Sequence, residues 1–211
     1  MNPPRRSFLT GLRTGIASLA FAGAAAAKPA SSASWQPARH DKDDWLDRPG
    51  TKHRLVFDTT TQEGFSEALL FAGNYIRVNN TDYGLQNSDL SVIIVVRHGS
   101  TPFGYTDPIW ARYGAPMATR FKFEDPKTKQ TPTLNVFDSD IEALAKQGVQ
   151  IAICSVATRV YAGVIAAAVG GSTDAINAEL IGNRVPGSLM VPAGIVAVNR
   201  AQERGYSLVR A

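Results

Sequence analysis

Cys154 is the only cysteine in the 211-residue sequence, and it stands at the end of an apolar run that begins after Gly148. A continuous apolar run is typical of a central parallel strand, which is covered on both faces. The segment from Val156 to Val169 is rich in alanine, contains no proline and favours a helix. A thiol between such a strand and such a helix lies where α/β proteins place reactive groups. The alternative is a small apolar core residue, because free cysteines are among the most buried residues.

His98 follows the clearest predicted strand, the β-branched run from Leu90 to Val96. The thiolate is the reactive form of cysteine, and both a helix N-terminus and a nearby cation favour that form. His98 is the first candidate for this cation or for a base, and Arg97 or Arg159 comes next. The alternative for His98 is a hydrogen bond to a loop carbonyl.

The elements around these residues alternate between strands and helices, which predicts an α/β fold with a mainly parallel sheet. Strands are expected over residues 54–59, 90–96, 149–154, 185–191 and 206–209. Helices are expected over about 64–78, 138–147, 156–169, 174–181 and 195–203. Residues 101–116 predict a structured loop with a short helix, and residues 121–132 a charged surface insertion.

The carboxyl ends of the predicted strands form the expected binding crevice, because ligands of open parallel sheets bind there. Residues 58–60, 98–100, 154–157 and 192–194 meet at this edge. Beside Cys154 and His98, the residues expected to line the crevice are Thr59, Thr60, Gly99, Ser155, Pro192 and Gly194. A weaker option is a small-molecule pocket over the crevice lined by Phe103, Tyr105, Trp110 and Tyr113.

Residues 1–27 predict a signal peptide. The segment from Arg5 to Thr10 resembles the twin-arginine export motif, and small residues up to Ala27 offer a cleavage site, with cleavage after Ala33 as the alternative. An ordinary secretory signal is the alternative. We expect export to the periplasm and no stable membrane insertion after cleavage, because no other apolar run reaches the roughly 18 residues of a membrane helix. Residues 28–51 are expected to form a polar linker and residues 52–211 one α/β domain.

The charge balance gives no support to nucleic-acid binding. The sequence has 22 basic and 18 acidic residues, and three of the arginines precede Ala27, so 22 − 3 = 19 basic residues remain against 18 acidic ones. Glycine-rich nucleotide-binding motifs are absent, so no cofactor is expected. The histidines at positions 40, 53 and 98 lack the spacing of metal ligands, so no metal is expected.

The order of these segments resembles the DsrE/DsrF-like sulfur-relay family. The matching features are His98-Gly99, the GVQIAICSVA stretch around Cys154, the strand end at residues 191–194 (VPAG) and the closing residues 201–208 (AQERGYSL). The resemblance covers residues 52–211 and implies a three-layer α/β/α sandwich with a five-stranded, mostly parallel sheet. It also implies homo- or hetero-oligomers, and a persulfide on Cys154 that passes between a sulfur donor and an acceptor protein. The long insertion at residues 101–132 and the export signal depart from the cytoplasmic sulfur carriers.

Two functions from different classes remain open at this point. The first is an exported sulfur- or thiol-handling protein that carries a persulfide on Cys154. The second is a non-catalytic, oligomeric binding or assembly module in which this cysteine is buried and inert.

Overall fold

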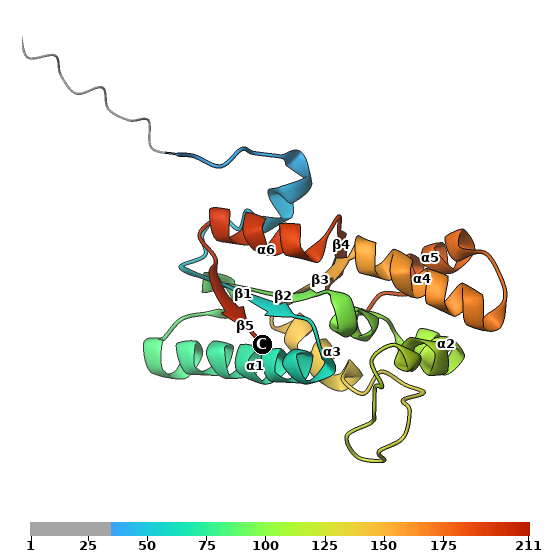
Figure 1. Ribbon diagram of the computed structural model, residues 1–211. Coiled ribbons are helices and arrows are strands. Elements are labelled where there is room, and N and C mark those ends of the chain that lie inside the picture. Colours follow the sequence, from blue (N-terminus) through green and yellow to red (C-terminus); the bar gives the residue numbers. More distant parts are fainter. Residues whose placement is uncertain (1–34) are drawn as a thin grey trace, which may run out of the picture. The chain divides into compact units, whose positions relative to one another are not determined.

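A computed structural model describes residues 35–211, and the helices and strands of this part of the chain lie in one compact unit, Pro37–Ala211 (Figure 1). The predicted signal peptide, residues 1–27, lies outside the described residues. Among the residues that are described, no helix combines the length and the apolar character needed to cross a membrane.

Five parallel strands form the sheet, in the order β4-β3-β2-β1-β5. Their bounds are β1 (His53–Thr59), β2 (Leu90–Val96), β3 (Gln150–Cys154), β4 (Ser188–Val191) and β5 (Ser207–Arg210). The register aligns Thr59 with Val96 and Cys154 with Val191, so the carboxyl ends of four strands meet at one edge. The predicted α/β fold with a parallel sheet is confirmed.

Helices cover both faces of the sheet, which gives the predicted three-layer sandwich (Figure 1). One face packs against α1 (Gln62–Tyr83) and α3 (Asp138–Lys146), and the other against α6 (Gly194–Glu203). Alternation along β2 explains the division, because Ile94 points into the first core and Ile93 into the second. Beside β3, α4 (Ser155–Val169) packs against α5 (Thr173–Gly182) and α2 (Asp107–Thr119) and extends the first core.

The segment expected to be a polar linker, residues 28–51, is partly folded into the domain, so the predicted boundary at residue 52 is wrong. Residues Asp41–Leu46 form a short 3-10 helix, η1, that contacts α6. Leu46 is 0% exposed within the second core, and its carbonyl accepts a hydrogen bond from the Tyr206 hydroxyl at 2.9 Å. One buried leucine therefore anchors an otherwise polar segment.

The region after β2 is more helical than the sequence predicts. It forms a 3-10 helix, η3 (His98–Gly104), followed by α2 (Asp107–Thr119), where a loop with a short helix was expected. The aromatic residues of this region pack on one another in the core; the Phe103 and Trp110 rings are stacked 5.2 Å apart. A small-molecule pocket lined by these aromatic residues is therefore wrong, because their side chains are the core itself.

Candidate functional site

Cys154 is the last residue of β3 and the N-cap of α4. Its Sγ accepts the backbone N–H of Ala157 at 3.4 Å. Its carbonyl oxygen accepts the Thr158 hydroxyl at 2.9 Å, and that hydroxyl in turn accepts the Tyr105 hydroxyl at 2.8 Å. The backbone of Cys154 is thus fixed by a buried hydrogen-bond chain, and its sulfur faces the positive end of a 15-residue helix.

A pocket of about 250 Å³ adjoins this thiol, and we call it the Cys154 pocket. It is formed where the ends of β2 and β3, the starts of α4 and α6, and the loop after α2 meet. Its lining residues are Arg97, His98, Arg120, Cys154, Val156, Ala157, Val160, Tyr161, Ala193, Gly194 and Ile195. Cys154 is 6% exposed, so a ligand reaches it through this pocket rather than on an open surface.

The structure brings together some of the residues predicted for the crevice and not others. Cys154, His98 and Gly194 line the Cys154 pocket. Thr59, Thr60, Gly99, Ser155 and Pro192 are not among its lining residues. The predicted crevice is therefore wrong in extent, because the pocket occupies only the β2–β3–β4 side of the sheet edge.

Thr59 and Gly99 have structural roles instead. The Thr59 hydroxyl is buried and donates to the Val95 carbonyl at 2.9 Å. The Ser100 hydroxyl donates to the Thr59 carbonyl at 2.9 Å, which ties η3 to the end of β1. A Cβ atom on Gly99 would lie 2.7 Å from the Thr60 carbonyl oxygen, so this close approach requires glycine.

Arg97 is the most firmly held cation of the pocket. Its Nε donates to Asp58 Oδ1 at 2.6 Å and its Nη2 to Asp58 Oδ2 at 2.8 Å. The pKa of Arg97 is raised, first by the hydrogen bonds to Asp58, against an opposing effect of burial, and further by the charges of Asp58 and Cys154. The positive charge of Arg97 would therefore attract a thiolate at Cys154.

Gly194 allows α6 to begin against Arg97. A Cβ atom at Gly194 would lie 2.7 Å from Cβ of Arg97 and 3.0 Å from its Cδ. The first turn of α6 therefore packs directly on the side chain of Arg97, which lies beside the Cys154 thiol.

His98 lies at the mouth of the pocket in a left-handed conformation, with φ of 56°. Its ring is exposed and packs edge-on against Phe121, with the ring centroids 4.8 Å apart. His98 forms no hydrogen bond with any described residue. The alternative role expected for it, a hydrogen bond to a loop carbonyl, is therefore not found within residues 35–211.

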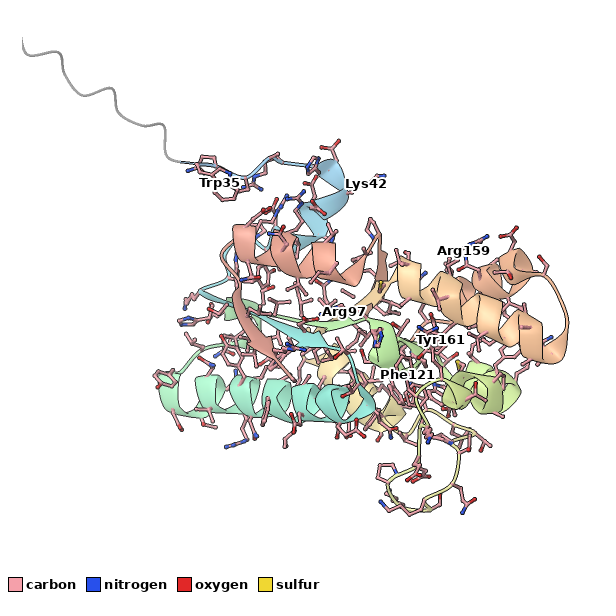
Figure 2. The ribbon with its side chains drawn as sticks, viewed as in Figure 1. Trp35, Lys42, Arg97, Phe121, Arg159 and Tyr161 are labelled. Carbon is pink, nitrogen blue, oxygen red and sulfur yellow. The ribbon has the colours of Figure 1, made fainter. Side chains whose placement is uncertain are left out.

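Sequence reasoning missed four lining residues of the pocket, Arg120, Val160, Tyr161 and Ile195, of which Arg120 and Tyr161 are polar. Arg120 precedes the surface insertion, and its guanidinium lies 5.4 Å from the ring centre of Phe121. Tyr161 follows Ala157 by four residues on α4, a helical spacing that places both on the pocket side. Figure 2 shows Arg97, Phe121 and Tyr161 in one region, with Arg159 on the outer side of α4. Arg159 pairs there with Asp174, so it does not serve as the cation of the site.

The charged side chains that line the Cys154 pocket, Arg97 and Arg120, are both basic. No aspartate or glutamate is among its lining residues, and the first turns of both α4 and α6 reach it. The N-cap of α6, Ala193, offers no side-chain acceptor to the N–H groups of that turn. Within residues 35–211, no cluster of three or more histidine, cysteine, aspartate or glutamate residues could hold a metal ion. The arrangement is suited to a reactive thiolate and an anionic ligand.

Comparisons with known proteins identify no family. No family model matches the sequence, and no curated protein matches it. A solved structure of a protein of unknown function from Methanobacterium thermoautotrophicum is similar over 75% of this chain and 99% of that chain, with a TM-score of 0.41 and 18% identity. The fold assignment rests on the strand order and register of this chain itself.

Proposed function

We propose that this protein handles sulfur, carrying a sulfane sulfur as a persulfide on Cys154. The observation that carries the proposal is the position of this thiol at the N-cap of α4, in a pocket lined by Arg97, His98 and Arg120. Helix N-termini and cations both favour the thiolate, the nucleophilic form of cysteine. The resemblance of the sequence to DsrE/DsrF-like sulfur-relay proteins supports the same role.

The chemistry requires no metal or redox cofactor. The Cys154 thiolate attacks the sulfane sulfur of thiosulfate, an S–S bond forms at Sγ, and the S–S bond of the donor breaks. Sulfite leaves with the bonding electron pair, and a persulfide anion remains on Cys154. An acceptor thiolate then attacks the outer sulfur and releases the Cys154 thiolate, so charge and atoms balance in both steps.

The surrounding residues hold the sulfur and neutralise charge. The N–H of Ala157 points at Sγ, and Arg97 provides a fixed positive charge that Asp58 keeps in place. His98, exposed at the mouth, is placed to take the proton of an acceptor thiol.

Mass spectrometry of the intact protein tests the carrier role. After incubation with thiosulfate or polysulfide, we expect a mass increase of one sulfur on the wild-type protein and none on Cys154→Ser. A small free thiol in the same tube serves as the reactivity control. If that thiol reacts while Cys154 stays unmodified, the carrier role is wrong.

A second candidate is the non-catalytic assembly module, and exposed apolar residues beside the pocket favour it. Val156 is 60% exposed, Val160 41% and Ile195 58%, although Cys154 itself is nearly buried. Thiol titration of the folded protein separates the two functions. Rapid labelling near neutral pH supports the carrier, whereas protection until denaturation supports the module. Native mass spectrometry gives the oligomeric state, which we propose to be a homo- or hetero-oligomer.

We also propose that the protein is exported to the periplasm through the twin-arginine pathway, on the strength of the Arg5-Arg6 motif. In a bacterium with this pathway, the wild-type chain should appear in the periplasmic fraction. The double substitution Arg5→Lys with Arg6→Lys should keep it in the cytoplasm. Periplasmic recovery of the double variant would point to the general secretion route instead.

A further inference from the structure

The basic side of the Cys154 pocket favours the binding of an anion. Arg97 is held by Asp58, whereas the Arg120 guanidinium lies over the Phe121 ring and forms no salt bridge with any described residue. The first turns of α4 and α6 face the same space, and no acidic side chain lines it. A negative ligand therefore gains from several positive groups and meets no acidic side chain in the lining of the pocket.

Tyr161 provides an independent indication of a ligand. It lines the pocket and is 1% exposed, and its hydroxyl is buried without a hydrogen-bond partner among residues 35–211. Buried hydroxyls are nearly always paired, because an unpaired one costs free energy. Burial raises the pKa of Tyr161 against the opposing charge of Arg120, so the hydroxyl stays protonated and can donate. An acceptor atom of a bound ligand would satisfy it after a shift of the Tyr161 side chain, because the hydroxyl has almost no accessible surface in this structure.

The mouth of the pocket is apolar. Val156 and Val160 lie one turn apart on α4, and Ile195 faces them from the first turn of α6. A small inorganic ion leaves these side chains in water, whereas an organic group on the ligand covers them and gains from their burial. The volume of about 250 Å³ lies just below the ~300–1,000 Å³ of drug-sized sites, which limits the organic group to a small one.

We propose that the Cys154 pocket binds a small organic sulfane-sulfur anion, such as a thiosulfonate with a short apolar group, and prefers it to inorganic thiosulfate. This inference rests on the proposed function of Cys154. The anionic head lies among Arg97, Arg120 and the helix N-termini, with the Tyr161 hydroxyl donating to it. The apolar group lies against Val160 and Ile195.

Benzenethiosulfonate illustrates the transfer. The Cys154 thiolate, its proton already lost to solvent, attacks the terminal sulfur of the donor. An S–S bond forms at Sγ and the bond between the sulfane and sulfonyl sulfurs breaks. Benzenesulfinate leaves with the electron pair, and one negative charge remains on the persulfide. The donor is the only co-reactant, and no external oxidant or reductant is needed.

Calorimetric titration of benzenesulfonate and of sulfate into Cys154→Ser tests binding without reaction. We expect saturable binding of benzenesulfonate, about tenfold tighter than that of sulfate. Adding Arg120→Gln should weaken both ligands about tenfold. Adding Ile195→Ala should weaken benzenesulfonate about threefold and leave sulfate unchanged.

Two matched controls come from the same helix. Arg159→Gln removes an arginine of α4 outside the pocket, and Val169→Ala trims an exposed valine outside it. Both should leave binding unchanged. Tyr161→Phe should weaken benzenesulfonate by a few fold while circular dichroism shows an unchanged fold. Absence of saturable benzenesulfonate binding, or equal effects of the pocket variants and the controls, overturns the inference.

Persulfide formation on the wild-type protein separates failure of the ligand class from failure of the function. Faster modification by benzenethiosulfonate than by thiosulfate, relative to a free thiol, supports the inference. Equal relative rates overturn the ligand class and leave the carrier role intact. Saturable binding of benzenesulfonate with no persulfide from either donor overturns the carrier role and supports the ligand class.

Discussion

The carboxyl edge of the sheet has two halves, and they differ in how their polar side chains are paired. Between β1 and β2, Asp58 is paired with Arg97, and the Thr59 and Ser100 hydroxyls have backbone partners. Between β3 and α6, Arg120 has no carboxylate partner and Tyr161 has no hydrogen-bond partner among the described residues. The two halves share Arg97, which faces both the paired carboxylate and the thiol.

The difference indicates which half holds the fold together and which half binds. Paired, buried polar groups stabilise the native state because breaking them exposes a full desolvation penalty. Buried groups without partners cost stability, and beside a pocket a bound ligand can supply the missing partner. The β1–β2 half is therefore a structural buttress, and the β3–α6 half is the candidate binding site.

The largest expected effect is a loss of stability when the β1–β2 half is changed. Asp58→Ala leaves Arg97 without its partner in a largely buried position, and we expect the free energy of unfolding to fall by about 3 kcal/mol. Urea denaturation followed by circular dichroism measures it. Glu142→Ala, which breaks the exposed pair with Lys146, should leave the midpoint unchanged. Similar losses of stability for Asp58→Ala and Glu142→Ala would show that the Asp58–Arg97 pair contributes no more than an exposed surface pair.

Gly99→Ala should have the next largest effect. The new methyl group would meet the Thr60 carbonyl and the Phe121 ring, and we expect a loss of about 2 kcal/mol through overpacking. Gly163→Ala is the matched control, because it lies on α4 with open space around it, and it should be neutral or stabilising. Equal stability of Gly99→Ala and Gly163→Ala in urea would show that the backbone at Gly99 shifts to make room for the added methyl group.

On the binding side, Arg120→Gln should change reactivity without changing stability. Arg120 attracts anions, so its loss should slow the reaction of Cys154 with iodoacetate about threefold relative to neutral iodoacetamide. The same ratio should fall with added salt in the wild-type protein. A ratio that Arg120→Gln and salt both leave unchanged would place the guanidinium outside the field of the thiol.

The smallest expected effect compares two buried tyrosines. Tyr161→Phe removes a hydroxyl that has no partner, so stability should change by less than about 0.5 kcal/mol. Tyr105→Phe removes a hydroxyl bonded to Thr158, so it should cost about 1 kcal/mol. Thermal unfolding of both variants decides the point, and an equal cost would mean that the Tyr161 hydroxyl has a partner after all.

The local pattern of the sequence predicted the strands and helices that position the Cys154 thiol. Leu90–Val96 was predicted with its bounds, because a β-branched apolar run fits only a central strand. The helix after Cys154 and the helix ending at Glu203 agree with prediction to within one residue at each end. Cys154, His98 and Gly194 reached the site because strand ends meet at one edge of a parallel sheet.

Residues outside the predicted elements depend on long-range packing, which a local pattern does not contain. Arg120 reaches the pocket because Phe121 and Phe123 turn the loop inward against the core. Leu46 is buried by contacts with α6 and Tyr206, more than a hundred positions away. Thr59 looked like a crevice residue, but η3 covers it, and nothing in the alternation of β1 indicates that cover.

The pairing of β5 with β1 bears on the order in which the molecule assembles. Leu55 aligns with Ser207, and the Asp58 carbonyl accepts the Ala211 N–H at 3.2 Å, so the last strand completes the neighbourhood of the carboxylate that holds Arg97. Contacts between such distant positions form slowly, because the whole intervening chain must be closed into a loop first. We therefore expect the cation beside Cys154 to be locked in place late in folding. A nascent or half-folded chain would then lack the fixed positive charge beside Cys154, so its thiol would gain no electrostatic help in reacting with anions until β5 has paired with β1.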